Sequence, residues 1–371
     1  MAFFFLITQQ GEMYTMQKTK PRYEWIDIAR GIAMMMVVFG HFMLATHAFD
    51  LVHHFIYLGS LPVFFFFSGM LFHLKTIKVR LKTVFNTLVV PYLVFALAIV
   101  VTEILHRVLI GDHWGFKNLI LGILWAGGDD ANKPGDVVSL GAVWFFIGLG
   151  VATLLFELIA QISRRLSEKW QTPIMIVMSA LLFAISFYVP AIAPWSLRGA
   201  LVGQFFMLFG YLFRNQMKAK WSLAAVWLIL VVSVAVWWVI AHAGNVIYLV
   251  VGDLQGNAFL VMIGALASVL ALSALGRLLE MPLFDKFGKM ISWVGEYSSI
   301  VLSVHAYILL ILESYVYGPT INNWVSAYGV WVAALLTVLI SIGSAIIGAL
   351  VIYKASVVQR VYMDRNWPLK I

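Results

Sequence analysis

The chain alternates between long apolar runs and short polar segments over most of its length. An uninterrupted apolar run of about 18 or more residues is long enough to form a helix that crosses a bilayer. Ten runs near this length occur, at about 28–47, 55–73, 84–106, 140–160, 173–192, 199–213, 222–242, 257–275, 297–315 and 326–353. The pattern therefore predicts an all-α, polytopic membrane protein with about ten transmembrane helices.

Basic residues gather on one side of this predicted arrangement. Twenty of the 25 Lys and Arg residues lie in polar segments that share a side with the N-terminus. The segments on the other side hold four, namely Arg107, Lys117, Lys133 and Arg198. Because basic loop residues are retained in the cytoplasm, both termini are predicted to be cytoplasmic. If one span had been missed, the polar segments after it would be assigned to the wrong sides and the basic residues would be spread over both. They are not.

Composition narrows the class of protein further. Hydrophobic residues make up 62% of the 371 residues and charged residues 11%, so spans use almost the whole chain. We predict one transmembrane domain over residues 25–355, with cytoplasmic tails at 1–24 and 356–371. The chain has no cysteine, which excludes disulfides and thiolate chemistry. The net charge of +8 is accounted for by the basic residues in the loops on one side of the membrane, so no nucleic-acid partner is expected.

Two ionisable residues interrupt the first apolar run. Arg30 and His41 are eleven positions apart, close to three helical turns, so both side chains project from one face with roughly 16 Å of rise between them. An ionisable group inside a membrane costs several kcal/mol unless it faces protein or water, which makes this face a predicted functional site. The small residues Gly31 and Gly40 would let another group approach closely. In the structural alternative, Arg30 anchors the helix at the headgroups and His41 is a buried structural residue.

Other polar residues lie within the predicted spans. His305, in the middle of the ninth run, is predicted to line the same site as His41, because each imidazole inside the membrane needs polar neighbours. Its alternative role is to bond another helix. Asp27 lies one turn before Arg30, where it can cap the helix or pair with the guanidinium. Three glutamates near the ends of runs are expected to reach water instead, namely Glu103, Glu157 and Glu313.

The second apolar run contains four consecutive phenylalanines, Phe64–Phe67, followed by Ser68. Such a run usually faces lipid or packs against other helices. Gly59, Pro62 and Gly69 can interrupt the helix, and interrupted helices occur where backbone lines a cavity. Ser68 is therefore a candidate lining residue.

The predicted external loops carry weaker signals. Segment 107–139 is rich in Gly, Asp, Asn and Pro, which fits either a lid offering aromatic platforms to a sugar or a solvated connector. His47, His53 and His54 crowd the first external loop, but no carboxylate accompanies them at ligand spacing, so no metal site is predicted. The chain has no P-loop, no G-x-G-x-x-G after a strand and no G-x-S-x-G. These absences argue against an ATPase, a dinucleotide enzyme and a serine hydrolase.

Four stretches resemble one known family. The segment 23–41, YEWIDIARGIAMMMVVFGH, is similar to the signature of the acyltransferase-3 membrane O-acyltransferases, in which an arginine or lysine, ten residues and a histidine mark the first span. The family's second, fourth and penultimate spans are matched in order by LPVFFFFSGMLF at 61–72, VWFFIGLG at 143–150 and GEYSSIVLSVHAYIL at 295–309. Where the family has several arginines before the proline of its third span, this chain has Lys75, Lys78, Arg80 and Lys82 before Pro91.

The resemblance implies transfer of an acyl group, usually acetyl from acetyl-CoA, to a hydroxyl of a surface or lipid-linked carbohydrate at a bacterial plasma (inner) membrane. It implies catalytic roles for His41 and His305. Substrate contacts are expected from Arg30, Asp27, Ser68, Arg80, Lys82 and Trp144. Acetyl-CoA is then a substrate, and no permanently bound cofactor is expected. The rival hypothesis is a transporter or flippase of a lipid-linked sugar, with Arg30 and His41 as a substrate or proton relay.

Overall fold

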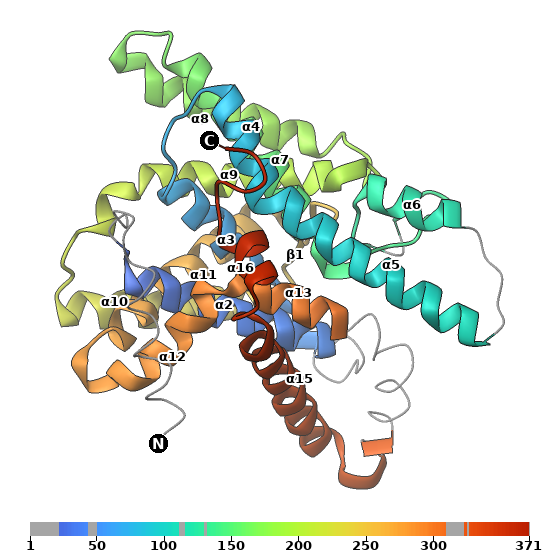
Figure 1. Cartoon of the computed structure of the whole chain (residues 1–371). Helices are drawn as coiled ribbons and strands as arrows, with labels where there is room; N and C mark the ends of the chain where they lie inside the picture. The colour runs from blue at the N-terminus through green and yellow to red at the C-terminus, as the bar shows by residue number, and fades with distance from the viewer. Residues whose placement is uncertain are drawn as a thin grey trace.

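The computed structural model describes residues 22–43, 50–110, 116–129, 132–308, 323–324 and 326–370. These residues are mostly helical and contain almost no sheet, which confirms the predicted all-α class (Figure 1). The main helices are α2 (Glu24–Met43), α3 (Asp50–Met70), α4 (Ile77–Val84), η3 (Phe85–Val89), α5 (Val90–Ile110), α6 (Phe116–Trp125), α7 (Trp144–Ser163), α8 (Glu168–Ser186), α9 (Leu197–Leu212), η6 (Arg214–Met217), α10 (Leu223–His242), α11 (Ala258–Leu279), α12 (Asp285–Glu296), α13 (Ser298–Ile308), α15 (Val330–Ile352) and α16 (Ser356–Tyr362). Two short strands, β1 (Val246–Tyr248) and β2 (Asp253–Gln255), form an antiparallel hairpin.

Each predicted apolar run overlaps one of these helices, and positions 44–47 and 309–315 of two runs lie outside the described residues. Six helical segments in the described part of the chain are long and apolar enough to cross a membrane. A seventh is added if Ile342–Ile352 and Ser356–Tyr362, bent by 108°, form one span. The predicted helices α2, α9 and α13 are not among these candidates, and α9 and α13 have only 16 and 11 residues. The count of ten and the cytoplasmic termini therefore stay predictions.

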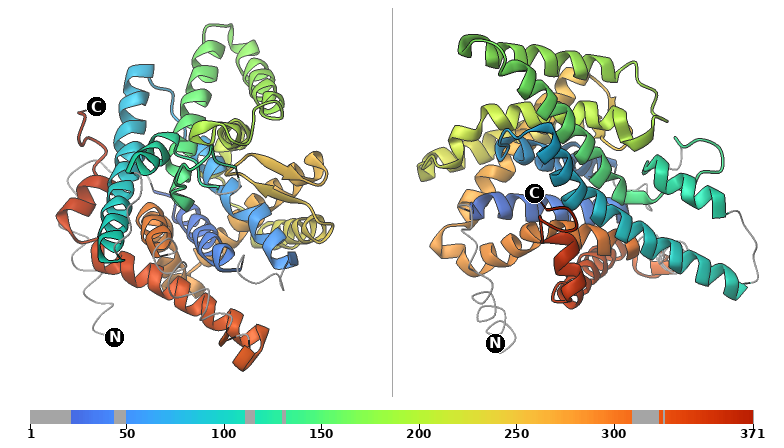
Figure 2. Two further views of the ribbon diagram at one scale, coloured as in Figure 1. Left: turned by 90° about the vertical axis from the view of Figure 1, so that its right-hand side faces the viewer. Right: turned by 45° about the horizontal axis from the view of Figure 1, so that its top comes forward.

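Helix α2 lies at the centre of the bundle. It packs against α3, α11, α12, α13 and α15, which come from both halves of the chain (Figure 1 and Figure 2). Glycines permit the closest of these contacts. A side chain at Gly31 would collide with the carbonyl oxygen of Ile291 on α12, and one at Gly295 would collide with that of Asp27. The apolar pattern did not predict α12, because its hydrophobic residues occupy one face only.

Helix α3 is continuous from Asp50 to Met70, so the interruption that Gly59, Pro62 and Gly69 could cause does not occur. Membrane helices tolerate proline when neighbouring helices support the freed backbone groups. Gly69 serves packing instead, because a Cβ there would overlap the backbone of Met207 on α9. The Ser68 hydroxyl donates to the carbonyl oxygen of Phe64, one turn earlier, at 2.7 Å. Ser68 is therefore hydrogen-bonded within its own helix.

The β1–β2 hairpin joins α10 to α11 and packs against α3. In its register Tyr248 pairs with Asp253, whose carboxylate lies 3.8 Å from the Arg198 guanidinium at the start of α9. A side chain at Gly199 would collide with the carbonyl oxygen of Leu249, so the start of α9 approaches the hairpin closely. The hairpin is thus fixed against two helices.

Candidate active site

The two histidines predicted to be catalytic meet between α2 and α13. Nε2 of His305 lies 3.3 Å from Nδ1 of His41, and the ring centroids are 5.2 Å apart. His305 is fully buried, whereas His41 is partly buried. The proximity expected from the sequence is therefore confirmed.

The hydrogen bonds of His41 fix the position of its proton. Nδ1 of His41 lies 2.8 Å from the carbonyl oxygen of Val37, one turn earlier on α2. A carbonyl oxygen only accepts, so Nδ1 of His41 carries the proton. In the neutral ring Nε2 of His41 then keeps its lone pair, and Nε2 of His305 accepts from the same Nδ1–H. His41 thus has the tautomer in which Nε2 can act as a general base.

Arg30 is held by two polar side chains. Its Nη2 donates to Oγ of Ser298 at 3.1 Å, and its Nη1 lies 3.6 Å from Oδ1 of Asp27. Of the two roles predicted for Asp27, pairing with Arg30 is therefore observed, since α2 already begins at Glu24. A guanidinium has five N–H donors, so these two contacts leave donors that an anionic ligand can use.

Arg30 and His41 face the same neighbouring helix, as predicted. Arg30 contacts Ser298, and His41, further along α2, contacts His305, further along α13. The two helices therefore run parallel, as the first and ninth spans of the predicted topology should. Together they form a polar strip with Arg30 at one end and the histidines roughly 16 Å further along α2.

An ionic cluster lies at the Arg30 end of this strip. Nε of Arg22 lies 2.7 Å from Oδ2 of Asp27, and its Nη1 pairs with Glu296. Burial lowers the pKa of the Arg22 guanidinium, but the hydrogen bonds to Glu296 and Asp27, together with their negative charges, outweigh burial, and the net shift of that pKa is upward. Arg22 therefore stays charged and shares Asp27 with Arg30.

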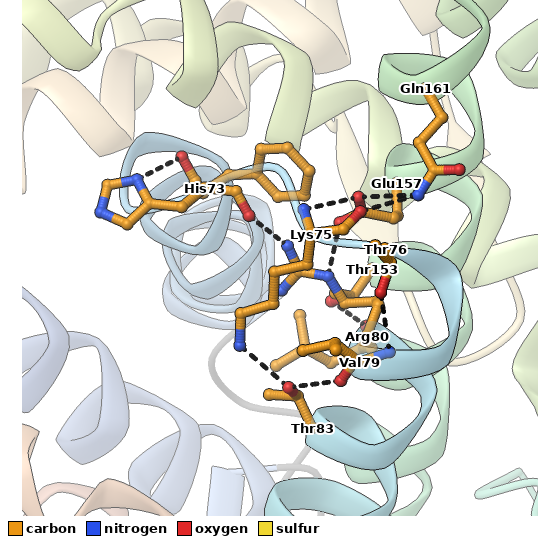
Figure 3. A network of polar contacts seen from close by, with 11 residues as sticks. His73, Lys75, Thr76, Val79, Arg80, Thr83, Thr153, Glu157 and Gln161 are labelled. Carbon is orange, nitrogen blue, oxygen red and sulfur yellow. Dashed lines mark hydrogen bonds and ion pairs between the residues drawn. The ribbon is translucent and has the colours of Figure 1, made fainter. Parts of the chain in front are cut away.

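Arg80 and Glu157 form a separate polar network between α4 and α7 (Figure 3). Nε of Arg80 donates to Oε2 of Glu157 at 2.6 Å, and its Nη2 donates to the carbonyl oxygen of His73 at 2.6 Å. Glu157 is 0% exposed, so the expectation that it reaches water is wrong. The packing of α4 on α7 brings a guanidinium to the carboxylate, and this pairing offsets the cost of burying the charge.

The same network fixes the linker between α3 and α4. Oε1 of Glu157 accepts from the backbone N–H of Lys75 at 2.9 Å, and Gln161, one turn further along α7, donates to the Lys75 carbonyl oxygen at 2.7 Å (Figure 3). The Arg80 guanidinium lies 4.7 Å from the ring centroid of Phe72. Arg80, a predicted substrate contact, is therefore engaged by protein groups in this structure.

The C-terminal residues bind to the junction of α4 and α5. The fully buried Asn86, in the π-helical turn η3, donates to the carbonyl oxygens of Arg365 at 2.9 Å and Leu369 at 2.6 Å. Its Oδ1 accepts from the Leu369 N–H at 3.2 Å. Lys82, another predicted substrate contact, donates to the carbonyl oxygen of Lys370 at 2.9 Å. No sequence motif distinguished Asn86, because its partners lie far along the chain.

The other predicted contacts lie elsewhere. Trp144, at the start of α7, is buried with its ring against Gly128 and Gly148. Trp125, in the segment predicted as a lid or connector, is buried and donates from Nε1 to the carbonyl oxygen of Ile192 at 3.0 Å. His47, Glu313 and the side chain of Glu103 lie outside the described residues. Four of the eight predicted site residues thus lie along α2 and α13 in two contacting pairs, Asp27 with Arg30 and His41 with His305.

Comparison with known proteins identifies the family. A family model described as an acyltransferase domain matches residues 23–354, which include both helices of the polar strip. No curated protein and no solved structure gives a significant match to the chain. The match covers most of the sequence and confirms the resemblance drawn from the four spans. The chain therefore belongs to the acyltransferase-3 family of membrane acyltransferases.

Proposed function

We propose that the protein transfers an acetyl group from cytoplasmic acetyl-CoA to a hydroxyl of a cell-surface or lipid-linked carbohydrate at the inner membrane of a bacterium. Membership of the family supports acyl transfer. The observation that carries the proposed site is the hydrogen bonding of His41. Its Nδ1–H is held by Val37 and His305, which leaves Nε2 as the basic atom.

Arg30 is proposed to hold the donor. In the predicted topology α2 begins at the cytoplasmic side, where acetyl-CoA is found, so Arg30 lies nearer that side than His41. A guanidinium suits the phosphates of CoA, and the positive charges of the exposed Lys78 and the half-buried Lys82 on α4 would attract the anion. The roughly 16 Å from Arg30 to His41 is the scale of a pantetheine arm, so a thioester can reach the histidine while the phosphates stay near Arg30.

The proposed reaction moves one proton in and out of His41. Nε2 of His41 takes the proton of the acceptor hydroxyl while the oxygen attacks the thioester carbonyl carbon. The C–S bond breaks, the acetyl group stays on the acceptor oxygen, and the CoA sulfur takes the proton back from Nε2. A neutral His305 accepting from Nδ1–H would stabilise the imidazolium formed between these steps.

The rival function is transport of a lipid-linked sugar, in which Arg30 and His41 would act as a substrate or proton relay. The test supplies purified protein in nanodiscs with acetyl-CoA and with surface polysaccharide from a strain that lacks the gene. An acetyltransferase releases free thiol and labels the polysaccharide with acetyl, whereas a carrier does neither. His41→Ala should bind labelled CoA like the parent and transfer acetyl at least about a hundredfold more slowly, as expected for a deleted general base. Transfer by His41→Ala at the parental rate would overturn the proposed mechanism.

A further inference from the structure

Aromatic side chains continue from His41, away from Arg30. The ring centroid of Tyr57 lies 6.5 Å from that of His41. The ring centroid of His53 lies 4.2 Å from that of Tyr57. The ring centroid of Tyr248 lies 5.4 Å from that of Tyr57 and 5.8 Å from that of His53. His53 and Tyr57 come from α3 and Tyr248 from β1, so the tertiary fold brings together rings that are remote in the sequence.

Rigid elements hold these rings in place. Gly40, the residue before His41, is packed against Tyr57, because a Cβ there would lie 3.2 Å from Cε2 of that ring. Tyr248 belongs to the hairpin that is fixed against α3 and the start of α9. A binding surface built on such elements keeps its geometry better than one on a free loop.

The exposure and chemistry of the three side chains suit a sugar. His305 is fully buried, whereas His41, His53, Tyr57 and Tyr248 are all partly exposed. Each of the three rings beyond His41 has an aromatic face, and each of the two tyrosines carries a hydroxyl, whereas Nε2 of His53 is buried. The C–H face of a sugar ring can stack on aromatic faces, and tyrosine hydroxyls can bond its hydroxyl groups. In the predicted topology α3 begins outside, so the rings lie on the side opposite the donor.

We propose that His53, Tyr57 and Tyr248 form the acceptor subsite and place a carbohydrate hydroxyl beside Nε2 of His41. This inference rests on the proposed function. The donor would reach His41 from the Arg30 end of the polar strip and the acceptor from the opposite end.

The test measures both substrates separately with the full-length protein in nanodiscs. The variants are Tyr57→Ala, Tyr248→Ala and the ring-preserving Tyr57→Phe and Tyr248→Phe, with Tyr188→Ala as the control. Tyr188 follows α8 on the same predicted side and is 88% exposed. The acceptor probe is the unacetylated surface polysaccharide of the deletion strain, the donor is labelled acetyl-CoA, and rates are normalised to folded protein.

Both alanine variants should raise the KM for the polysaccharide about tenfold, while CoA binding stays at the parental level. The phenylalanine variants should raise this KM less than the alanine variants, because they keep stacking and lose only a hydroxyl. Tyr188→Ala should stay within about twofold of the parent, because it lies outside the subsite. An unchanged polysaccharide KM in both alanine variants would overturn the subsite, as would an equal loss of CoA binding. Tyr248→Ala leaves the contact between α2 and α3 intact. If Tyr57→Ala does not fold, the polysaccharide KM of Tyr248→Ala therefore tests the subsite. Failure of the parent to acetylate any saccharide fraction would instead refute the proposed function, and the subsite with it.

Discussion

Nε2 of His305 faces Nδ1 of His41 at 3.3 Å, and this contact joins the first predicted span of the chain to the ninth. Because Nδ1 of His41 also donates to the carbonyl oxygen of Val37, the neutral His305 acts as an acceptor. His305 can therefore orient His41 without occupying its Nε2. This division of roles predicts different effects for changes at the two positions.

His305→Ala should slow acetyl transfer by at least about tenfold, because the imidazolium of His41 loses a hydrogen-bond acceptor. His305→Gln should recover part of that loss, since the amide oxygen can accept from Nδ1–H of His41. The measurement is the single-turnover rate across pH, alongside CoA binding. If Ala and Gln at this position reduce only the amount of folded protein and leave the rate per folded molecule unchanged, His305 is structural.

Arg30→Ala should weaken acetyl-CoA binding by about 1.5 to 3 kcal/mol, the usual contribution of a hydrogen bond to a charged group. Arg30→Lys should restore part of the affinity, since a positive charge remains while the fork of donors is lost. Binding of labelled CoA to detergent-stable protein measures both changes. Ser298→Ala is the matched control, because it removes one neighbour of Arg30 and keeps the guanidinium. Parental affinity in Arg30→Ala would remove Arg30 from the donor site.

Glu157→Gln should destabilise the protein by about 3 to 5 kcal/mol, because it leaves the buried Arg80 guanidinium without its counter-charge. Replacing both partners, as Arg80→Met with Glu157→Leu, should cost less than the single change. Chemical denaturation in mixed micelles measures the free energy of unfolding. Lys289→Ala, which removes an exposed pair with Asp285, should change stability little. A double variant that is as unstable as Glu157→Gln would contradict this account.

Asn86→Ala should release the C-terminal residues, because it removes three hydrogen bonds to Arg365 and Leu369. Loss of such bonds at a buried site is worth about 1 to 3 kcal/mol, enough to raise the open fraction of the segment at least severalfold. Amide hydrogen exchange over residues 363–370 reports the opening. Asn215→Ala, on the exposed η6, should leave that exchange unchanged. Equal protection in Asn86→Ala and the parent would show that other contacts hold the segment.

The predicted topology can be tested by labelling, because the chain has no cysteine. A single cysteine in place of Asp136, which is exposed in the predicted external segment 107–139, should react with a membrane-impermeant maleimide in intact cells, whereas one at Lys169 or Lys370 should react only after the membrane is opened. These positions lie on opposite predicted sides according to the distribution of basic residues. Labelling of Lys370→Cys in intact cells would place the C-terminus outside and require an odd number of spans.

The sequence already predicts the helices and the identity of the central residues. Apolar runs depend on local composition, so helices occur at all ten predicted positions. The one-face relation of Arg30 and His41 follows from helical periodicity, and both residues do contact α13. The failures have local causes as well. The amphipathic α12 carries too many charges to resemble a span. Pro62 does not interrupt α3, because neighbouring helices support a membrane helix at proline.

By itself, the sequence determined the membrane class, the family signature and the eleven-residue spacing between Arg30 and His41, because these depend on composition and on distances along one helix. Only the tertiary structure decided which groups pair. Glu157 is buried because α4 brings Arg80 to it, Asn86 binds residues nearly 280 positions later, and Tyr248 joins His53 and Tyr57 through a hairpin. Such contacts depend on the packing of remote segments, which local periodicity does not encode.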